Sequence, residues 1–92
     1  MMLESLFISR AQTRLVQHFL NNIGRYMNMS AIAEESGMAH STIHRVIQPL
    51  VDMNIIDEIS AGAQARLFIM EPTNKMTKVL VRFVYDMESS LS

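Results

Sequence analysis

The chain has 92 residues, 49% of them apolar, and its eight Lys and Arg against nine Asp and Glu give a formal net charge of −1. This length fits one domain with a single hydrophobic core. Because there is no cysteine, disulfides and thiolate metal sites are excluded. No apolar run approaches the roughly 18 residues of a membrane span, and Glu4 stands where a secretory signal would be basic. We therefore expect a soluble, cytoplasmic protein without membrane contact.

The first predicted helix spans about residues 9 to 22. Ser9 and Gln12 form a capping-box pattern at its start, in which each side chain satisfies a backbone N–H group of the first turn. Apolar residues then recur at helical spacing, which gives the helix one face for the core. Asn22 and Gly24 are both suited to the left-handed conformation that ends many helices, so we expect this scaffold helix to stop there.

Two further helices are predicted on either side of Gly37, one over about residues 29 to 36 and one over about residues 40 to 53. Asn28 is the expected N-cap of the shorter helix, because its side-chain oxygen can accept from a free N–H group of the first turn. Gly37 allows a tight turn between the two helices. The stretch is therefore interpreted as helix, turn and helix.

The second of these helices has two chemically different faces. At about 100° per residue from Ile43, one arc is apolar and comprises Ile43, Val46, Ile47, Leu50 and Val51. The opposite arc is polar and, before Asp52, carries no acid; it comprises Ser41, Thr42, His44, Arg45 and Gln48. Side chains of these types reach phosphate oxygens and base edges from a helix in a major groove. The pattern predicts that this helix binds double-stranded DNA.

The same region resembles a known family. The segments from Ile32 to Met38, Ser41 to Arg45 and Leu50 to Ile56 are similar to the helix-turn-helix of winged-helix transcriptional regulators of the MarR/ArsR type, particularly the small archaeal ones. The resemblance implies a mainly α fold with a small β-hairpin, in which a three-helix core is followed by a wing and a C-terminal dimerisation helix. It also implies a short first strand at Tyr26 and Met27.

Two positions depart from the pattern of that family. Ala39 stands where a Ser or Thr N-cap is usual, so we expect Ser41 or His40 to cap the recognition helix instead. Pro49 stands where Lys or Glu is common. Since proline has no backbone N–H group, the carbonyl of Arg45 loses its helical partner, and we expect the helix to bend there or to end its regular part.

A hairpin, the wing, is predicted over about residues 55 to 70. Isoleucines and acids alternate imperfectly at its start, small residues form a turn, and β-forming residues follow. The turn carries no charge, so Gln64, Arg66 and the backbone of Gly62 are the expected wing contacts with a minor groove or a phosphate. A hairpin that only covers the core is an equally good interpretation of each of these residues.

The last predicted helix spans about residues 73 to 90, with Thr73 or Asn74 as its cap. An apolar stripe expected to face the core runs along it and comprises Met76, Val79, Leu80, Phe83, Val84, Met87 and Leu91. Val81 and Tyr85 lie four residues apart on the far side, where a second apolar stripe needs a partner. The resemblance implies a homodimer through this helix; the alternative is two exposed apolar residues on a monomer.

The predicted DNA contacts on the recognition helix are His40, Ser41, Thr42, His44, Arg45 and Gln48. Arg45 is assigned to a guanine edge or a phosphate, and Gln48 and His44 are assigned to base edges. One arginine against five acids gives residues 31 to 60 a net charge of −4, so we expect modest affinity from one subunit. A homodimer with recognition helices about 34 Å apart would read a palindromic site and add the two contributions.

Other functions have weaker support. His40 and His44 could share one metal ion from one helical face, but no nearby Cys or third His completes a zinc site, and we expect neither a metal nor another cofactor. No phosphate loop, nucleophile elbow or metalloprotease motif is present, so an enzyme is not expected. The serious alternative is a winged-helix protein–protein interaction module without DNA binding, which the slightly acidic composition also fits.

Overall fold

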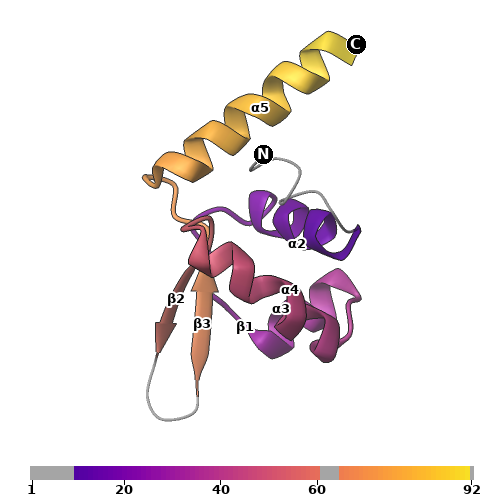
Figure 1. Ribbon diagram of the computed structural model, residues 1–92, viewed down its shortest axis with the longest axis vertical. Coiled ribbons are helices and arrows are strands. Elements are labelled where there is room, and N and C mark those ends of the chain that lie inside the picture. Colours follow the sequence, from indigo (N-terminus) through magenta and orange to yellow (C-terminus); the bar gives the residue numbers. More distant parts are fainter. Residues whose placement is uncertain (1–9, 61–64, 92) are drawn as a thin grey trace.

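Four helices and a small sheet make up the part of the chain that the structure, a computed structural model, describes, namely residues 10–60 and 65–91. The helices are α2 (Arg10–Leu20), α3 (Met29–Ser36), α4 (His40–Asp52) and α5 (Lys75–Leu91). In Figure 1, α2, α3 and α4 lie together beside the sheet, and α5 extends away from them. Ser9, the predicted capping residue, lies outside the described residues.

The ends of α2 and α3 follow from local chemistry. Gly24, just after α2, has a φ of +83°, a conformation that costs glycine little. Asn28 caps α3 as expected, since its side-chain oxygen accepts from the N–H of Ala31 at 2.8 Å. Gly37 ends α3 with a φ of +72°, and its N–H bonds to the carbonyl of Ala33 at 3.0 Å. This left-handed turn is what redirects the chain into α4.

The sheet has three antiparallel strands in the order β1-β3-β2. They are β1 (Met27–Asn28), β2 (Asp57–Ser60) and β3 (Arg66–Ile69). Met27 pairs with Phe68, and Asp57 pairs with Ile69. The expected first strand is displaced by one residue, because Tyr26 lies outside β1 with 51% of its surface exposed.

One buried cluster joins the three helices to the sheet. Its members come mostly from the three helices, from β1 and β3 and from the segments beside them, and include Leu15, Phe19, Met27, Ile32, Ile43, Ile47, Leu50, Ile55, Ile56, Phe68 and Met70. The four apolar residues Ile43, Val46, Ile47 and Leu50 turn one side of α4 into this cluster. The element order and the small antiparallel sheet confirm the predicted fold class, a mainly helical winged helix-turn-helix.

The prediction that the apolar stripe of the last helix faces the core is wrong for most of its length. Leu80 is buried and Met76 packs partly against the core, but Val79, Phe83 and Met87 are exposed. The physical reason is the position of α5, which in Figure 1 lies beyond α2 and apart from α3, α4 and the sheet, so that few of its side chains reach the buried cluster. The stripe is therefore a surface in this chain.

Candidate nucleic-acid interface

The polar side of α4 lies at the surface, as expected from its period. His40, Ser41, His44, Arg45 and Gln48 are exposed, and Thr42 is half-buried. Within the described residues, no hydrogen bond or ion pair engages the side chains of His40, His44 or Arg45. An imidazole or guanidinium without an internal partner can bind a phosphate or a base edge without first giving up another contact. This surface is the candidate interface.

The start of α4 differs from the expectation of a side-chain cap. Ala39 is the N-cap residue in an extended conformation, and no side chain accepts a hydrogen bond from the first turn. Neither His40 nor Ser41 takes that role, because both lie inside the helix that they were expected to cap. The first N–H groups of α4 therefore lack a side-chain acceptor, and such groups favour an anion.

Pro49 does not end α4. The helix continues to Asp52, and the N–H of Met53 bonds to the carbonyl of Pro49 at 3.0 Å. Proline removes one donor, so only the carbonyl of Arg45 loses its usual partner. Pro49 is exposed, while its neighbour Leu50 is fully buried, and burial of the apolar side keeps the last turn in place.

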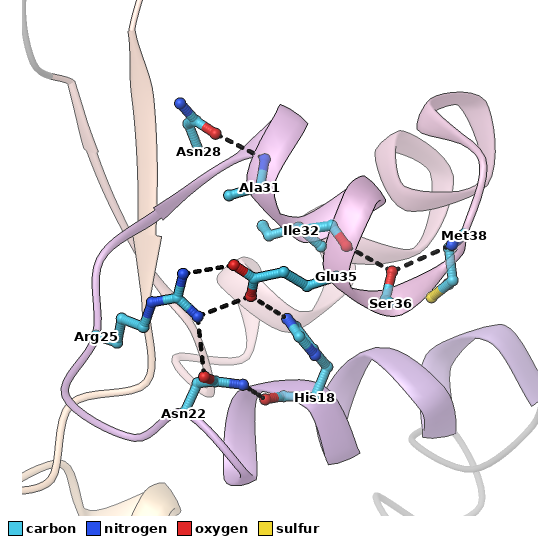
Figure 2. Close-up of polar contacts among 9 residues, drawn as sticks. All are labelled: His18, Asn22, Arg25, Asn28, Ala31, Ile32, Glu35, Ser36 and Met38. Atoms are coloured by element: carbon cyan, nitrogen blue, oxygen red, sulfur yellow. Dashed lines mark hydrogen bonds and ion pairs between the residues drawn. The ribbon is translucent and has the colours of Figure 1, made fainter.

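Hydrogen bonds fix the turn between α3 and α4 (Figure 2). The hydroxyl of Ser36 donates to the carbonyl of Ile32 at 2.6 Å and accepts from the N–H of Met38 at 3.2 Å. From α2, the guanidinium of Arg14 donates to the carbonyl of Ser36 at 2.8 Å. The direction in which α4 leaves α3 is thus set by contacts on both sides of the turn.

A polar cluster ties α3 to α2 and to the loop after α2, as Figure 2 shows. Arg25 donates to both carboxylate oxygens of Glu35, at 2.7 Å and 2.5 Å, and to the side-chain oxygen of Asn22 at 3.0 Å. These hydrogen bonds lower the pKa of Glu35 and raise that of Arg25. This cluster could not be predicted from local spacing, because Glu35 lies ten residues after Arg25 and on a different element. The guanidinium of Arg25 is therefore engaged by intramolecular hydrogen bonds, although its side chain is partly exposed.

His18 borders the same cluster. Its Nε2 atom lies 3.3 Å from a carboxylate oxygen of Glu35, yet the geometry is not that of a hydrogen bond. The contact is therefore a close polar approach and not a hydrogen bond. With a side chain only 14% exposed, His18 is a packed boundary residue.

The wing carries a paired arginine. Arg66 donates to both carboxylate oxygens of Glu58 at 2.9 Å, and its guanidinium lies 5.2 Å from the centre of the Phe68 ring. The pair raises the pKa of Arg66 and lowers that of Glu58. Arg66 is opposite Ser60 and Glu58 is opposite Phe68, so the two charges are diagonal neighbours across the hairpin. Gln64, the other predicted wing contact, lies outside the described residues together with Gly62.

Gln48 is also engaged at the far end of the polar face. Its side-chain amide donates to Asp52 at 2.9 Å, one helical turn away. A base contact by Gln48 must therefore replace or share that hydrogen bond. Arg45, by contrast, has neither a carboxylate nor a carbonyl partner among the described residues. The predicted contacts are thus brought onto one face of α4, but they differ in how readily they can bind.

The second candidate surface is α5. Among the described residues eight large hydrophobic side chains are exposed, and six of them lie on α5: Val79, Val81, Phe83, Tyr85, Met87 and Leu91. Beside Val81 and Tyr85 is a hollow of about 430 Å³, closed on its other side by Ile23 and Pro72. So large an apolar surface on one helix is unusual for a monomer.

Residues 10–60 and 65–91 contain neither a candidate metal site nor a candidate membrane span. No three His, Cys, Asp or Glu side chains gather there as a metal site would require. No helix in these ranges is long and apolar enough to cross a membrane.

Comparison with known proteins supports the architecture. No family model and no curated protein matches the chain. A solved structure of a protein from Methanosarcina mazei Go1, described as a possible transcriptional regulator, superposes with a TM-score of 0.71 over 97% of this chain and 78% of that one. The two sequences are 16% identical, so the likeness shows a shared fold.

Proposed function

We propose that the chain is a sequence-specific, double-stranded DNA-binding transcriptional regulator of the MarR/ArsR type. In this proposal residues 1–92 form one winged-helix domain that acts in the cytoplasm as a homodimer. The observation that carries it is the exposed polar face of α4, where Arg45, His40 and His44 have no internal partner in the described part of the chain. The shared fold with a protein described as a possible transcriptional regulator supports the same class of function.

The proposed contacts follow from the reach of each side chain. With α4 in the major groove, Arg45 binds a guanine edge or a phosphate, and His44 and Gln48 read base edges. Ser41 and Thr42 lie in the first turn of α4, next to N–H groups suited to a phosphate. Arg66 can contact the DNA phosphates only after its ion pair with Glu58 is broken. We therefore assign most of the DNA contacts to α4.

The homodimer forms through α5 in this proposal. Val81 and Tyr85 are 44% and 66% exposed, and burying them against a second subunit removes apolar surface from water. Two copies of α4 then bind successive major grooves about 34 Å apart. Pairing the subunits doubles the phosphate contacts of a domain whose own net charge is −1.

Selection of duplexes from a random pool tests the DNA-binding proposal. The full chain should enrich a palindromic or nearly palindromic site. Its affinity for that site should fall with salt by about 0.9 log units per log unit for each phosphate contacted. Enrichment should be lost in Arg45→Ala with the circular dichroism spectrum unchanged. Absence of any duplex shift at low salt would reject the proposal and favour a protein-binding module.

Sedimentation equilibrium tests the dimer separately. The double variant Val81→Ser, Tyr85→Ser should sediment as a monomer at concentrations where the wild type is a dimer. Tyr26→Ser is a matched control, because it removes an aromatic residue that is 51% exposed but lies outside α5. A monomeric wild type, or a double variant that stays dimeric, would rule out this surface as the interface.

A further inference from the structure

Asn74 connects two helices through opposite ends of one amide. Its side-chain oxygen accepts from the N–H of Met76 at 2.8 Å, which caps the start of α5. Its side-chain nitrogen donates to the backbone carbonyl of Asn54 at 2.9 Å. Asn54 follows α4 closely, so the end of α4 and the start of α5 share a single side chain.

The partner of Asn74 is itself held rigidly. Asn54 has a φ of +61°, its N–H bonds to the carbonyl of Val51 at 3.0 Å, and the N–H of Ile55 bonds to the carbonyl of Leu50 at 3.0 Å. These two bonds around a left-handed residue form a Schellman motif that ends α4. Because Ile55 and Leu50 are fully buried, the Asn54 carbonyl has a direction fixed by the core.

Apart from Asn74, few contacts attach α5 to the rest of the protein. Thr77 and Leu80 are its buried residues, and the connection before it is attached to the body where the N–H of Gly24 bonds to the carbonyl of Met70 at 2.9 Å. After Leu80 every described side chain of α5 is exposed except that of Val84, which is half-buried, and this part of the helix borders an open hollow against α2. In Figure 1 α5 lies apart from α3, α4 and the sheet. A long helix with so few buried side chains needs an additional contact if its angle to the rest of the protein is to be defined.

We propose that Asn74 is a positioning residue that fixes the angle between α5 and the recognition helix α4. The consequence for DNA rests on the proposed function. In the proposed dimer this angle sets the distance between the two recognition helices, and that distance sets the half-site spacing that the dimer accepts. The 17 residues of α5 span about 25 Å, so a tilt of about 10° at the base moves the far end by about 4 Å. One base pair advances the duplex by about 3.4 Å, which makes such a tilt equivalent to a change of one base pair.

Two substitutions separate the cap from the connection. Asn74→Asp and Asn74→Ser both keep an oxygen that can cap α5, but neither keeps the amide donor that reaches Asn54. The serine variant also excludes an effect of added charge. Asn28→Asp is the matched control, since Asn28 caps α3 through the same oxygen and no described residue accepts from its amide nitrogen.

Distance measurement between spin labels tests the angle without DNA. The chain has no cysteine, so Ser41→Cys on α4 and Glu88→Cys on α5 give two unique label sites. Dilution with unlabelled protein restricts the signal to one subunit. In both Asn74 variants the distance distribution should broaden about twofold or shift by several ångströms, and in Asn28→Asp it should match the wild type. Wild-type distributions in both Asn74 variants would overturn the proposal.

A library of palindromic duplexes with variable spacing tests the consequence. The wild type should prefer one spacing over its neighbours by about tenfold, and the Asn74 variants should reduce that preference to about threefold or less. Retention of the full preference in both variants would refute the role of Asn74 in spacing. A wild type that binds no duplex would refute the proposed function instead, while the label distances would still decide the role of Asn74 in the angle.

Discussion

The recognition helix and the wing were each predicted to meet DNA through an arginine, and they present it in opposite ways. Arg45 extends from the exposed side of α4 without an internal partner among the described residues. Arg66 donates two hydrogen bonds to Glu58 and lies over Phe68. A cation already satisfied by a carboxylate must lose that contact before it can bind a phosphate. The contribution of an arginine to DNA affinity therefore depends on what it releases as well as on what it binds.

The largest expected difference between the two regions appears on truncation of each arginine. Arg45→Ala should weaken binding to the selected duplex by about 10-fold to 100-fold, the usual effect of losing a direct base or phosphate contact. Arg66→Ala should weaken it by about threefold or less, because Arg66 is already paired with Glu58 and contributes little to neutralising phosphates. Fluorescence anisotropy at one fixed salt concentration measures both. Equal losses in the two variants would contradict the comparison.

A smaller effect of opposite sign is expected when the wing arginine is released. Glu58→Gln removes the negative charge that holds Arg66 and should raise duplex affinity by about threefold to tenfold. The slope of log affinity against log salt should become steeper by about 0.9, the value for one added phosphate contact.

Asp57→Asn is the control for that release. It removes a charge from the neighbouring position of β2, and no described residue pairs with the Asp57 side chain. It should change the affinity less than Glu58→Gln does and leave the salt slope unchanged. The same steepening in both variants would mean that general repulsion, and not the pairing of Arg66, limits the wing.

The difference between the two arginines also separates what the sequence could predict from what it could not. The faces of α4 depend on a period of 3.6 residues within one short stretch, so the exposure of Arg45 follows from local spacing. The pairing of Arg66 with Glu58 depends on the register of a hairpin. Register was not predicted because the turn contains small residues without a defined turn type. An acid and an arginine on opposite arms of a predicted hairpin are nevertheless a signal that could have raised the question.

The error on α5 has the same physical origin, because it also depends on packing between elements that are distant in the chain. Periodicity correctly identified an apolar stripe, and Met76 and Leu80 at its start do pack against the body. It could not predict how far the body extends beside the helix, which depends on the placement of α2, the sheet and the connection after β3. Phe83 and Met87 have the spacing of core residues and are exposed. A hydrophobic stripe defines a contact surface, but sequence alone does not tell whether the contact is internal.

The smallest expected effect concerns Arg25, a second arginine paired with a glutamate, which donates from the loop after α2 to Glu35 of α3. Because Arg25 lowers the pKa of Glu35 below its ordinary value of 4.5, ionised Glu35 contributes stability that is present above that value and is lost as the pH falls through the lower pKa of the folded state. Glu35→Gln should therefore lower the thermal midpoint at neutral pH, and the difference from wild type should shrink below about pH 4.5 as the carboxylate is protonated.

Adjacent Glu34 provides the control for this pH dependence, because it is exposed and no described residue pairs with it. Glu34→Gln should leave the thermal midpoint nearly unchanged at every pH, since an isolated surface carboxylate contributes little. If Glu35→Gln lowered the midpoint equally at pH 3 and pH 7, the effect would come from lost packing. If both glutamine variants behaved alike, the hydrogen bonds from Arg25 would contribute nothing measurable to stability. Pairing with a carboxylate would then matter for Arg66 but not for Arg25.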